Sequence, residues 1–177
     1  MPFPLFRRTP HSTICALYGA IVAQARRPAF YRIYGVADSV TGRFELIVLH
    51  TALLLRRMAD EPALHALGQG IFDEFCRDMD HNLREMGVGD TGVPRQMKRI
   101  GEAFFGRRNA YLAVLTPGQE DGLPEVLRRN LYEGDAAAPA PRMAQYVRAA
   151  VLNLLSQETL AISQGKLSFP EPESIRE

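Results

Sequence analysis

The chain has 177 residues, which is enough to bury one substantial core and most simply forms a single domain. Its 21 Lys and Arg residues nearly balance its 20 Asp and Glu residues, so the composition alone does not point to a nucleic-acid partner, and we expect no specific DNA binding. Cys15 and Cys76 have no nearby cysteine partner, which argues against a disulfide framework or a C-x-x-C metal site. We expect no secretory signal, and the best apolar stretch, residues 44–55, is too short to cross a membrane.

The first 37 residues carry the chain's most uneven charge. They contain five arginines and no acidic residue, which leaves the remainder with a net charge of −4. A basic, partly amphipathic terminus is attracted to phosphate, either on an anionic membrane or on ribosomal RNA. The alternative is a solvated helix face without a partner. The candidate membrane or ribosome contacts are Arg7, Arg8, Arg26, Arg27 and Arg32.

Apolar residues recur at helical spacing along most of the chain, and no segment alternates with a period of two. We therefore predict an all-α fold, a single domain of about six helices with a central antiparallel helical hairpin. An ordered loop, 28–42, separates the first two helices, and the fourth is expected to break near Gly106. The expected helices cover residues 12–25, 44–60, 62–86, 94–115, 123–132 and 143–155.

The predicted domain boundaries follow from these elements. A basic N-terminal segment covers residues 1–11, and the all-α domain covers residues 12–167. The last ten residues contain Pro170 and Pro172 among several acids, so residues 168–177 are expected to form a flexible acidic tail.

A glycine-rich turn joins the third and fourth expected helices. Gly87, Gly89 and Gly92 spell G-x-G-x-x-G, a string that binds dinucleotides only between a strand and a helix. A helix precedes it here, so we do not interpret it as a nucleotide site. Gly87 instead closely follows an apolar helical stripe, where a left-handed glycine is typical of a helix end.

Charge is distributed unevenly across this turn. Residues 73–85 are rich in acids and residues 93–108 are rich in bases, so we expect ion pairs to line the hairpin. The predicted pairs join one of Asp73, Asp78 and Asp80 to one of Lys98, Arg99 and Arg107.

Four side chains on the third helix could support chemistry, since Glu74, Asp78, His81 and Glu85 share one face. They suggest a small all-α enzyme that acts with a metal or on a diphosphate. However, no second acidic cluster complements them, and the spacing of neighbouring charges also fits a solvated face. We therefore predict no catalytic residues, no metal site and no cofactor.

Two residues of the second helix stand out from their surroundings. His50 lies within an apolar helix, and Arg43 lies near the helix start, where a positive charge is unfavourable to the helix dipole. Both are expected to have specific partners. For His50 we favour a hydrogen-bonded core histidine over a functional role.

A longer pattern emerges when these segments are read together. Residues 42–50 read GRFELIVLH, 72–75 read FDEF, 77–80 read RDMD, and 82–90 read NLREMGVGD. With Val93-Pro94, Met97-Lys98 and residues 101–104 (GEAF), this pattern resembles the ubiquinol-cytochrome c chaperone family over most of residues 17–115.

The resemblance implies a function without catalysis. Members of this family bind newly made cytochrome b and help to assemble the cytochrome bc1 complex, and the mitochondrial members act near the ribosome. This chain looks like a bacterial-type member, which implies a cytoplasmic protein, peripheral at the inner face of the inner membrane. Cytochrome b is then the expected partner, with the ribosome and the membrane surface as further contacts.

The residues expected to line or brace a client-binding surface come from the matching segments. The alternative for each is that it only holds the hairpin together. They are Arg43, Phe44, His50, Asp73, Arg77, Asp78, Asn82, Arg84, Asp90 and Lys98.

Overall fold

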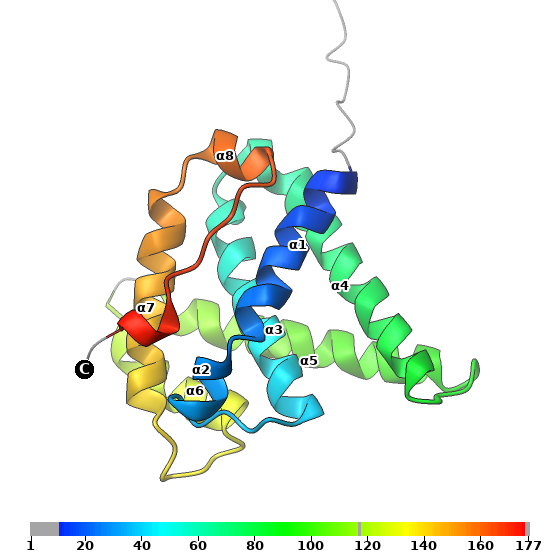
Figure 1. The fold of residues 1–177 in the computed structure, drawn as a ribbon, viewed down its shortest axis with the longest axis horizontal. Coiled ribbons are helices and arrows are strands. Elements are labelled where there is room, and N and C mark those ends of the chain that lie inside the picture. The colour runs from blue at the N-terminus through cyan, green and yellow to red at the C-terminus, as the bar shows by residue number, and fades with distance from the viewer. Residues whose placement is uncertain (1–10, 117, 176–177) are drawn as a thin grey trace, which may run out of the picture.

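The structure is a computed structural model that describes residues 11–116 and 118–175. These residues form a single all-α domain, as predicted, without a strand in the described part. Figure 1 shows the arrangement of the helices around α3. The longer helices are α1 (His11–Ala25), α3 (Val40–Ala59), α4 (His65–Glu85), α5 (Val93–Val114), α6 (Leu123–Leu131) and α7 (Ala140–Ser156).

Short helices complete the chain between and after these elements. They are α2 (Pro28–Arg32), η1 (Pro62–Leu64), η2 (Glu120–Gly122), α8 (Thr159–Ser163) and η3 (Pro172–Ser174). The predicted loop 28–42 is thus partly helical, because Pro28 occupies the first turn of α2, where its missing N–H is tolerated. Among the described residues no helix is long and apolar enough to span a bilayer.

Helix α3 lies at the centre of the fold and packs against α1, α4, α5, α6 and α7. Its buried residues include the continuous run 45–54, so it is covered on all sides rather than along one stripe. The helix begins earlier than the sequence suggested, because the Ser39 hydroxyl accepts a hydrogen bond from the Gly42 amide at 3.0 Å and caps its first turn.

The turn between α4 and α5 confirms the role expected of Gly87. Its φ is 84°, and its amide donates to the Arg84 carbonyl at 3.0 Å. The Val88 amide donates to the Leu83 carbonyl at 3.0 Å, which completes a Schellman motif at the end of α4. Helix α5 then runs unbroken through Gly106, contrary to the predicted break.

Aromatic rings, rather than the predicted ion pairs, connect α4 with α5. Phe104 lies 5.0 Å from both Phe72 and Phe75, measured between ring centroids. None of the predicted pairs between the acids and bases of this hairpin is present among the described residues. Asp73 and Asp80 instead interact within α4, with Gln69 and Arg84, and Asp78 accepts a hydrogen bond from Tyr18 of α1.

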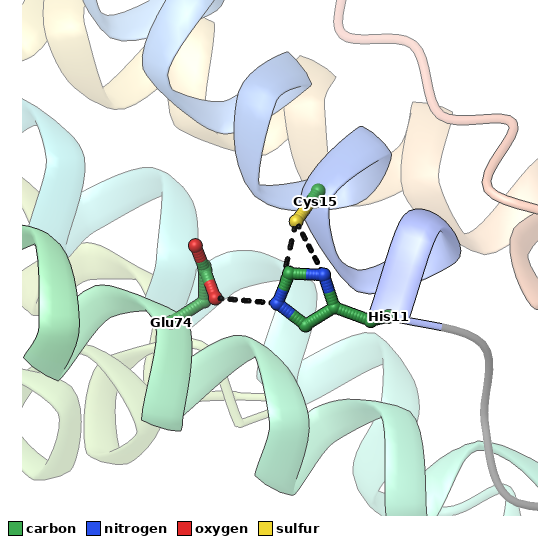
Figure 2. A group of neighbouring side chains, drawn as sticks. All are labelled: His11, Cys15 and Glu74. Carbon is green, nitrogen blue, oxygen red and sulfur yellow. Dashed lines mark hydrogen bonds and ion pairs between the residues drawn. The ribbon is translucent and has the colours of Figure 1, made fainter.

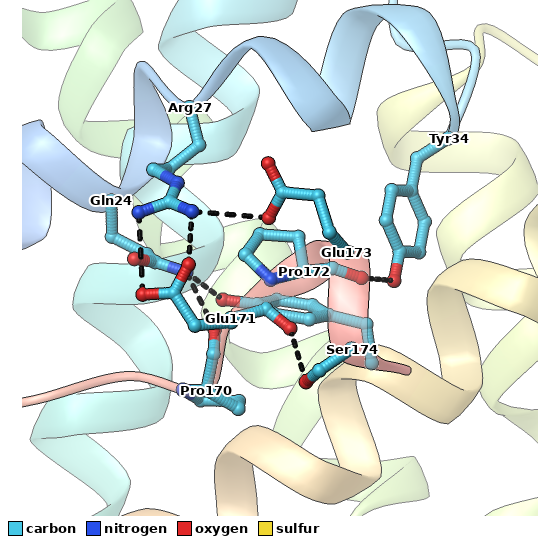
Figure 3. Close-up of polar contacts among 9 residues, drawn as sticks. Gln24, Arg27, Tyr34, Pro170, Glu171, Pro172, Glu173 and Ser174 are labelled. Atoms are coloured by element: carbon cyan, nitrogen blue, oxygen red, sulfur yellow. Dashed lines mark hydrogen bonds and ion pairs between the residues drawn. The ribbon is translucent and has the colours of Figure 1, made fainter. Parts of the chain in front are cut away.

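The C-terminal segment 168–175 is packed rather than flexible, which corrects the sequence-based expectation for that part of the tail. Figure 3 shows how it lies against α1 and α2. Gln24 donates to the Pro170 carbonyl at 3.0 Å, and the Tyr34 hydroxyl donates to the Pro172 carbonyl at 2.8 Å. Arg27 forms ion pairs with Glu171 and Glu173. The prolines and acids that suggested a loose tail therefore supply acceptors for side chains far away in sequence.

Candidate functional site

A wide groove opens where the end of α1, the start of α3, the end of α4 and the middle of α5 come together. Its volume is about 1240 Å³. The first part of the chain contributes Ala25, Arg26, Pro28, Tyr31, Arg32, Asp38, Val40, Thr41, Arg43, Phe44, Glu45 and Ile47. Helices α4 and α5 contribute Met79, Asn82, Leu83, Glu85, Met86, Arg99, Ile100, Ala103 and Arg107.

The floor of the groove is apolar. Phe44 and Ile47 come from α3, while Met79 and Leu83 continue the buried stripe of α4. This stripe extends past the end of the helix to Met86, whose side chain is 58% exposed. Large apolar groups that face water at the end of an amphipathic stripe mark a surface able to cover another apolar object.

Arginines surround this floor. Five of them line the groove: Arg26, Arg32, Arg43, Arg99 and Arg107. Arg43 is paired with Asp38, its Nη2 lying 2.7 Å from Oδ1, which confirms that this residue has a specific partner. Within residues 11–116 and 118–175, Arg26, Arg32 and Arg99 form no ion pair. The rim is therefore available to anionic groups.

The Arg107–Glu45 pair is the buried part of this rim. Arg107 Nε donates to both carboxylate oxygens of Glu45, at 2.7 and 2.6 Å. Glu45 is almost fully buried, and this burial raises its pKa, although the hydrogen bonds from Arg107 partly offset the effect. The pair joins α3 to α5 within the lining of the groove and so helps to hold these two helices together.

The structure brings several of the predicted residues together at this groove. Arg43, Phe44 and Asn82 were expected to line or brace a client surface, and all of them line it. Arg26 and Arg32, expected to contact a membrane or ribosome, lie on the same rim. Two separate expectations from the sequence thus converge on one surface.

Other predicted client residues lie away from the groove. His50 is fully buried, its Nε2 lying 2.8 Å from the Tyr146 hydroxyl, as expected of a core histidine. Arg84 bridges Asp80 and Asp90 at the end of α4, at 2.8 and 2.5 Å. Asp73 accepts a hydrogen bond from Gln69, and Lys98 lies 3.9 Å from Glu102. These residues brace local structure.

The remaining basic candidates have different surroundings. Arg27 is occupied by the C-terminal segment through Glu171 and Glu173. Arg7 and Arg8 lie outside the described residues.

Three of the four side chains proposed for an enzyme site, Glu74, Asp78 and His81, line one hollow between α1 and α4, but each interacts with a different neighbour. Asp78 accepts hydrogen bonds from the Tyr18 hydroxyl at 2.7 Å and from Asn82 at 3.2 Å. His81 lies 3.1 Å from Glu85, and Glu74 is paired with Arg77. Burial and the Asp78 carboxylate raise the pKa of Tyr18, so its hydroxyl stays a hydrogen-bond donor.

Sequence reasoning missed much of the groove. No motif singled out Met79, Met86 or Ile100, and Arg99 and Arg107 were expected to pair with acids of the facing helix. The available signal was the apolar stripe of α4, which continues to Met86 beside the glycine turn. Nothing in the sequence placed that end next to the start of α3.

Comparisons with known proteins support one family. The family described as Ubiquinol-cytochrome C chaperone matches residues 32–169. A crystal structure of the Cbp3 homolog from Brucella abortus is similar, with 38% sequence identity and a TM-score of 0.87. The similarity covers 97% of this chain and 98% of that one. No curated protein sequence gives a significant match.

Proposed function

Because this chain belongs to the ubiquinol-cytochrome c chaperone family, we propose that it is an assembly chaperone of the cytochrome bc1 complex whose groove holds newly made cytochrome b. The observation that carries this proposal is the apolar lining between α3, α4 and α5, which is bordered by Arg26, Arg32 and Arg99 and by the exposed side chains of Val40 and Met86.

The size of the groove suits a helical client segment. A helix about 10 Å wide rises 1.5 Å per residue, so the groove volume corresponds to roughly ten residues of helix. Before insertion, the segments of a membrane protein expose apolar surface to water, which is unfavourable. Laying one face of such a segment against Phe44, Met79 and Ile100 removes part of that surface from water.

The arginine rim gives the groove a second property. Arg26, Arg32 and Arg99 provide positive charge beside the apolar floor, so the same face is attracted to anionic lipid headgroups. This charge supports a peripheral location at the cytoplasmic face of the bacterial inner membrane, where a client would be transferred. The ribosome is a further proposed contact, since RNA phosphates attract the same side chains.

The proposal includes no catalytic step. Holding a client requires apolar area and charge, whereas the carboxylates of α4 are engaged with neighbouring side chains. We infer that the protein is not an enzyme and acts by reversible binding.

Co-purification of the tagged protein from its native membranes in mild detergent tests the client. Mass spectrometry and a haem spectrum should show cytochrome b enriched without the mature complex. Met86→Glu should reduce this enrichment at least tenfold, because it puts a charge at the edge of the apolar floor. Leu152→Glu is the matched control, since Leu152 is 68% exposed on α7, which does not line the groove.

Both variants must keep the wild-type melting temperature for the comparison to be valid. Equal enrichment of cytochrome b with both variants would refute the groove as the binding surface. Absence of cytochrome b from the wild-type preparation would refute the client itself.

Membrane attachment is tested separately with vesicles. Wild type should bind vesicles that contain anionic lipid, and binding should weaken as salt rises. Replacing Arg26, Arg32 and Arg99 together by Gln should abolish it, whereas Arg95→Gln, an exposed arginine outside the groove, should not. Binding that persists in the triple variant would contradict this assignment.

A further inference from the structure

His11, Cys15 and Glu74 form a cluster of potential metal ligands on the opposite end of α1 from the groove. Figure 2 shows the imidazole of His11 beside the Cys15 thiol and the Glu74 carboxylate. The Nε2 atom of His11 lies 3.8 Å from Cys15 Sγ and 3.7 Å from Glu74 Oε2, and the Nδ1 atom lies 3.4 Å from the same sulfur. One ligand atom from each residue lies within 4.8 Å of the others.

The backbone explains why these side chains meet. His11 and Cys15 are one turn apart on α1, so they share a face. Gly70 on α4 faces Ile14, and a Cβ at Gly70 would lie only 2.4 Å from Ile14 Cδ1. The missing side chain therefore allows the two helices to approach closely. Glu74 lies one turn after Gly70, which brings its carboxylate to the pair on α1.

Two of the three spacings in the cluster approach those of a zinc coordination sphere. Zinc binds histidine nitrogen and carboxylate oxygen at about 2.0–2.2 Å and cysteine sulfur at about 2.3 Å. In a tetrahedron these bond lengths place neighbouring ligand atoms roughly 3.3–3.6 Å apart. The two distances from His11 Nε2 exceed this range by only a few tenths of an ångström.

We propose that His11, Cys15 and Glu74 bind a zinc ion that connects α1 to α4, with water in the fourth position. The mixed nitrogen, sulfur and oxygen set favours zinc over magnesium or calcium, which prefer oxygen ligands alone. Nothing in the sequence suggested a metal here, since Cys15 has no cysteine partner nearby. The Cys15 side chain is exposed and so is accessible to an ion.

Arg77 is the neighbour that a zinc ion must displace. Its Nη1 contacts Glu74 and lies 3.3 Å from His11 Nε2, so the guanidinium stands where positive charge would enter. The Arg77 side chain is 56% exposed, which allows it to turn into solvent when the ion binds. Arg77 therefore lowers the affinity of the site without blocking it.

Zinc titration of the full chain, after removal of any histidine tag, tests the site. Calorimetry should show one zinc ion per chain, and Cys15→Ser and Glu74→Gln should each weaken binding at least tenfold. Arg77→Met should tighten it, because the competing charge is gone. His81→Ala and Cys76→Ser are matched controls that should leave the affinity unchanged, as neither residue belongs to the cluster.

Alkylation of the thiols gives an independent readout. Zinc should protect Cys15 from iodoacetamide in wild type but not in His11→Ala, with Cys76 as the internal reference. Equal zinc affinity of wild type and Cys15→Ser, weaker binding by Arg77→Met, or unprotected Cys15 in saturating zinc would overturn the proposal.

Discussion

His50 and Tyr146 meet in the core where α3 packs against α7, and a hydrogen bond of 2.8 Å joins His50 Nε2 to the tyrosine hydroxyl. The other ring nitrogen, Nδ1, lies 2.7 Å from the Leu46 carbonyl. Because a carbonyl only accepts, Nδ1 carries the proton and Nε2 accepts from Tyr146. Gln24 in turn donates to the Tyr146 hydroxyl at 2.9 Å, so the neutral imidazole is fully satisfied.

Lowering the pH should destabilise the protein through His50. Burial lowers the pKa of His50 from 6.5 to about 4, so between these values the unfolded chain binds the proton and the folded chain does not. The stability that depends on neutral His50 is complete above pH 6.5 and is lost as the pH falls towards 4. At pH 5 the loss is about 2 kcal/mol.

Chemical denaturation at pH 7.5 and pH 5 measures this loss. His50→Gln should be less stable than wild type at pH 7.5, but the difference should shrink at pH 5, since glutamine takes up no proton. A difference that stays constant with pH would show that His50 does not control this transition.

Breaking the Arg107–Glu45 pair should lower the free energy of unfolding more than breaking a surface ion pair does. Arg107→Met leaves a buried carboxylate without its donor, which should reduce the free energy of unfolding by roughly 1–3 kcal/mol. Adding Glu45→Gln should recover part of this loss, because the buried charge is removed. Arg43→Met is the control, since its partner Asp38 is exposed and the change should be small.

Urea denaturation of the four proteins tests this ranking. The stability that Arg107→Met loses relative to wild type should also become smaller at low pH, where protonation removes the charge of Glu45. If the variant with both Arg107→Met and Glu45→Gln were less stable than Arg107→Met alone, the unpaired charge of Glu45 would not be the cause of the loss.

Two glycines should respond oppositely to alanine. A Cβ at Gly42 would lie 2.0 Å from the Ala37 carbonyl oxygen, so Gly42→Ala should destabilise the start of α3 by about 1–3 kcal/mol. Gly106 lies within α5, where an added Cβ would meet no neighbouring group within 4 Å, so Gly106→Ala should stabilise by roughly 0.5–1 kcal/mol. Thermal melts distinguish the two, and a stabilising Gly42→Ala would refute the close contact.

The sequence predicted what local patterns determine. The stripe of α4 and the left-handed Gly87 depend on residues close together in the chain, and both were confirmed. Helix α2 was missed because its five residues are too few to show a helical period. Family resemblance identified Arg43 and Phe44, but Ile100 joins them only because α5 folds back beside α3, which no local pattern indicates.

The packed C-terminal segment provides the clearest case of a contact that local sequence could not predict, since Gln24 and Pro170 are 146 positions apart. Removing residues 168–177 should destabilise the domain. The truncation removes the acceptors of Gln24 and Tyr34 and uncovers His50, whose ring lies 5.1 Å from that of Phe169. The buried Tyr34 hydroxyl loses its only acceptor among the described residues, at a cost of about 1 kcal/mol or more.

Removing only residues 176–177 is the matched control, and it should leave the stability unchanged. Hydrogen exchange measured by mass spectrometry should show faster exchange in α2 and at the end of α1 for the longer truncation, because η3 packs against α2. Equal exchange in both truncations would show that the segment rests on the domain without stabilising it. Faster exchange confined to α1 and α2, with exchange in α4 and α5 unchanged, would mean that the segment supports the edge of the groove that carries Arg26 and Arg32.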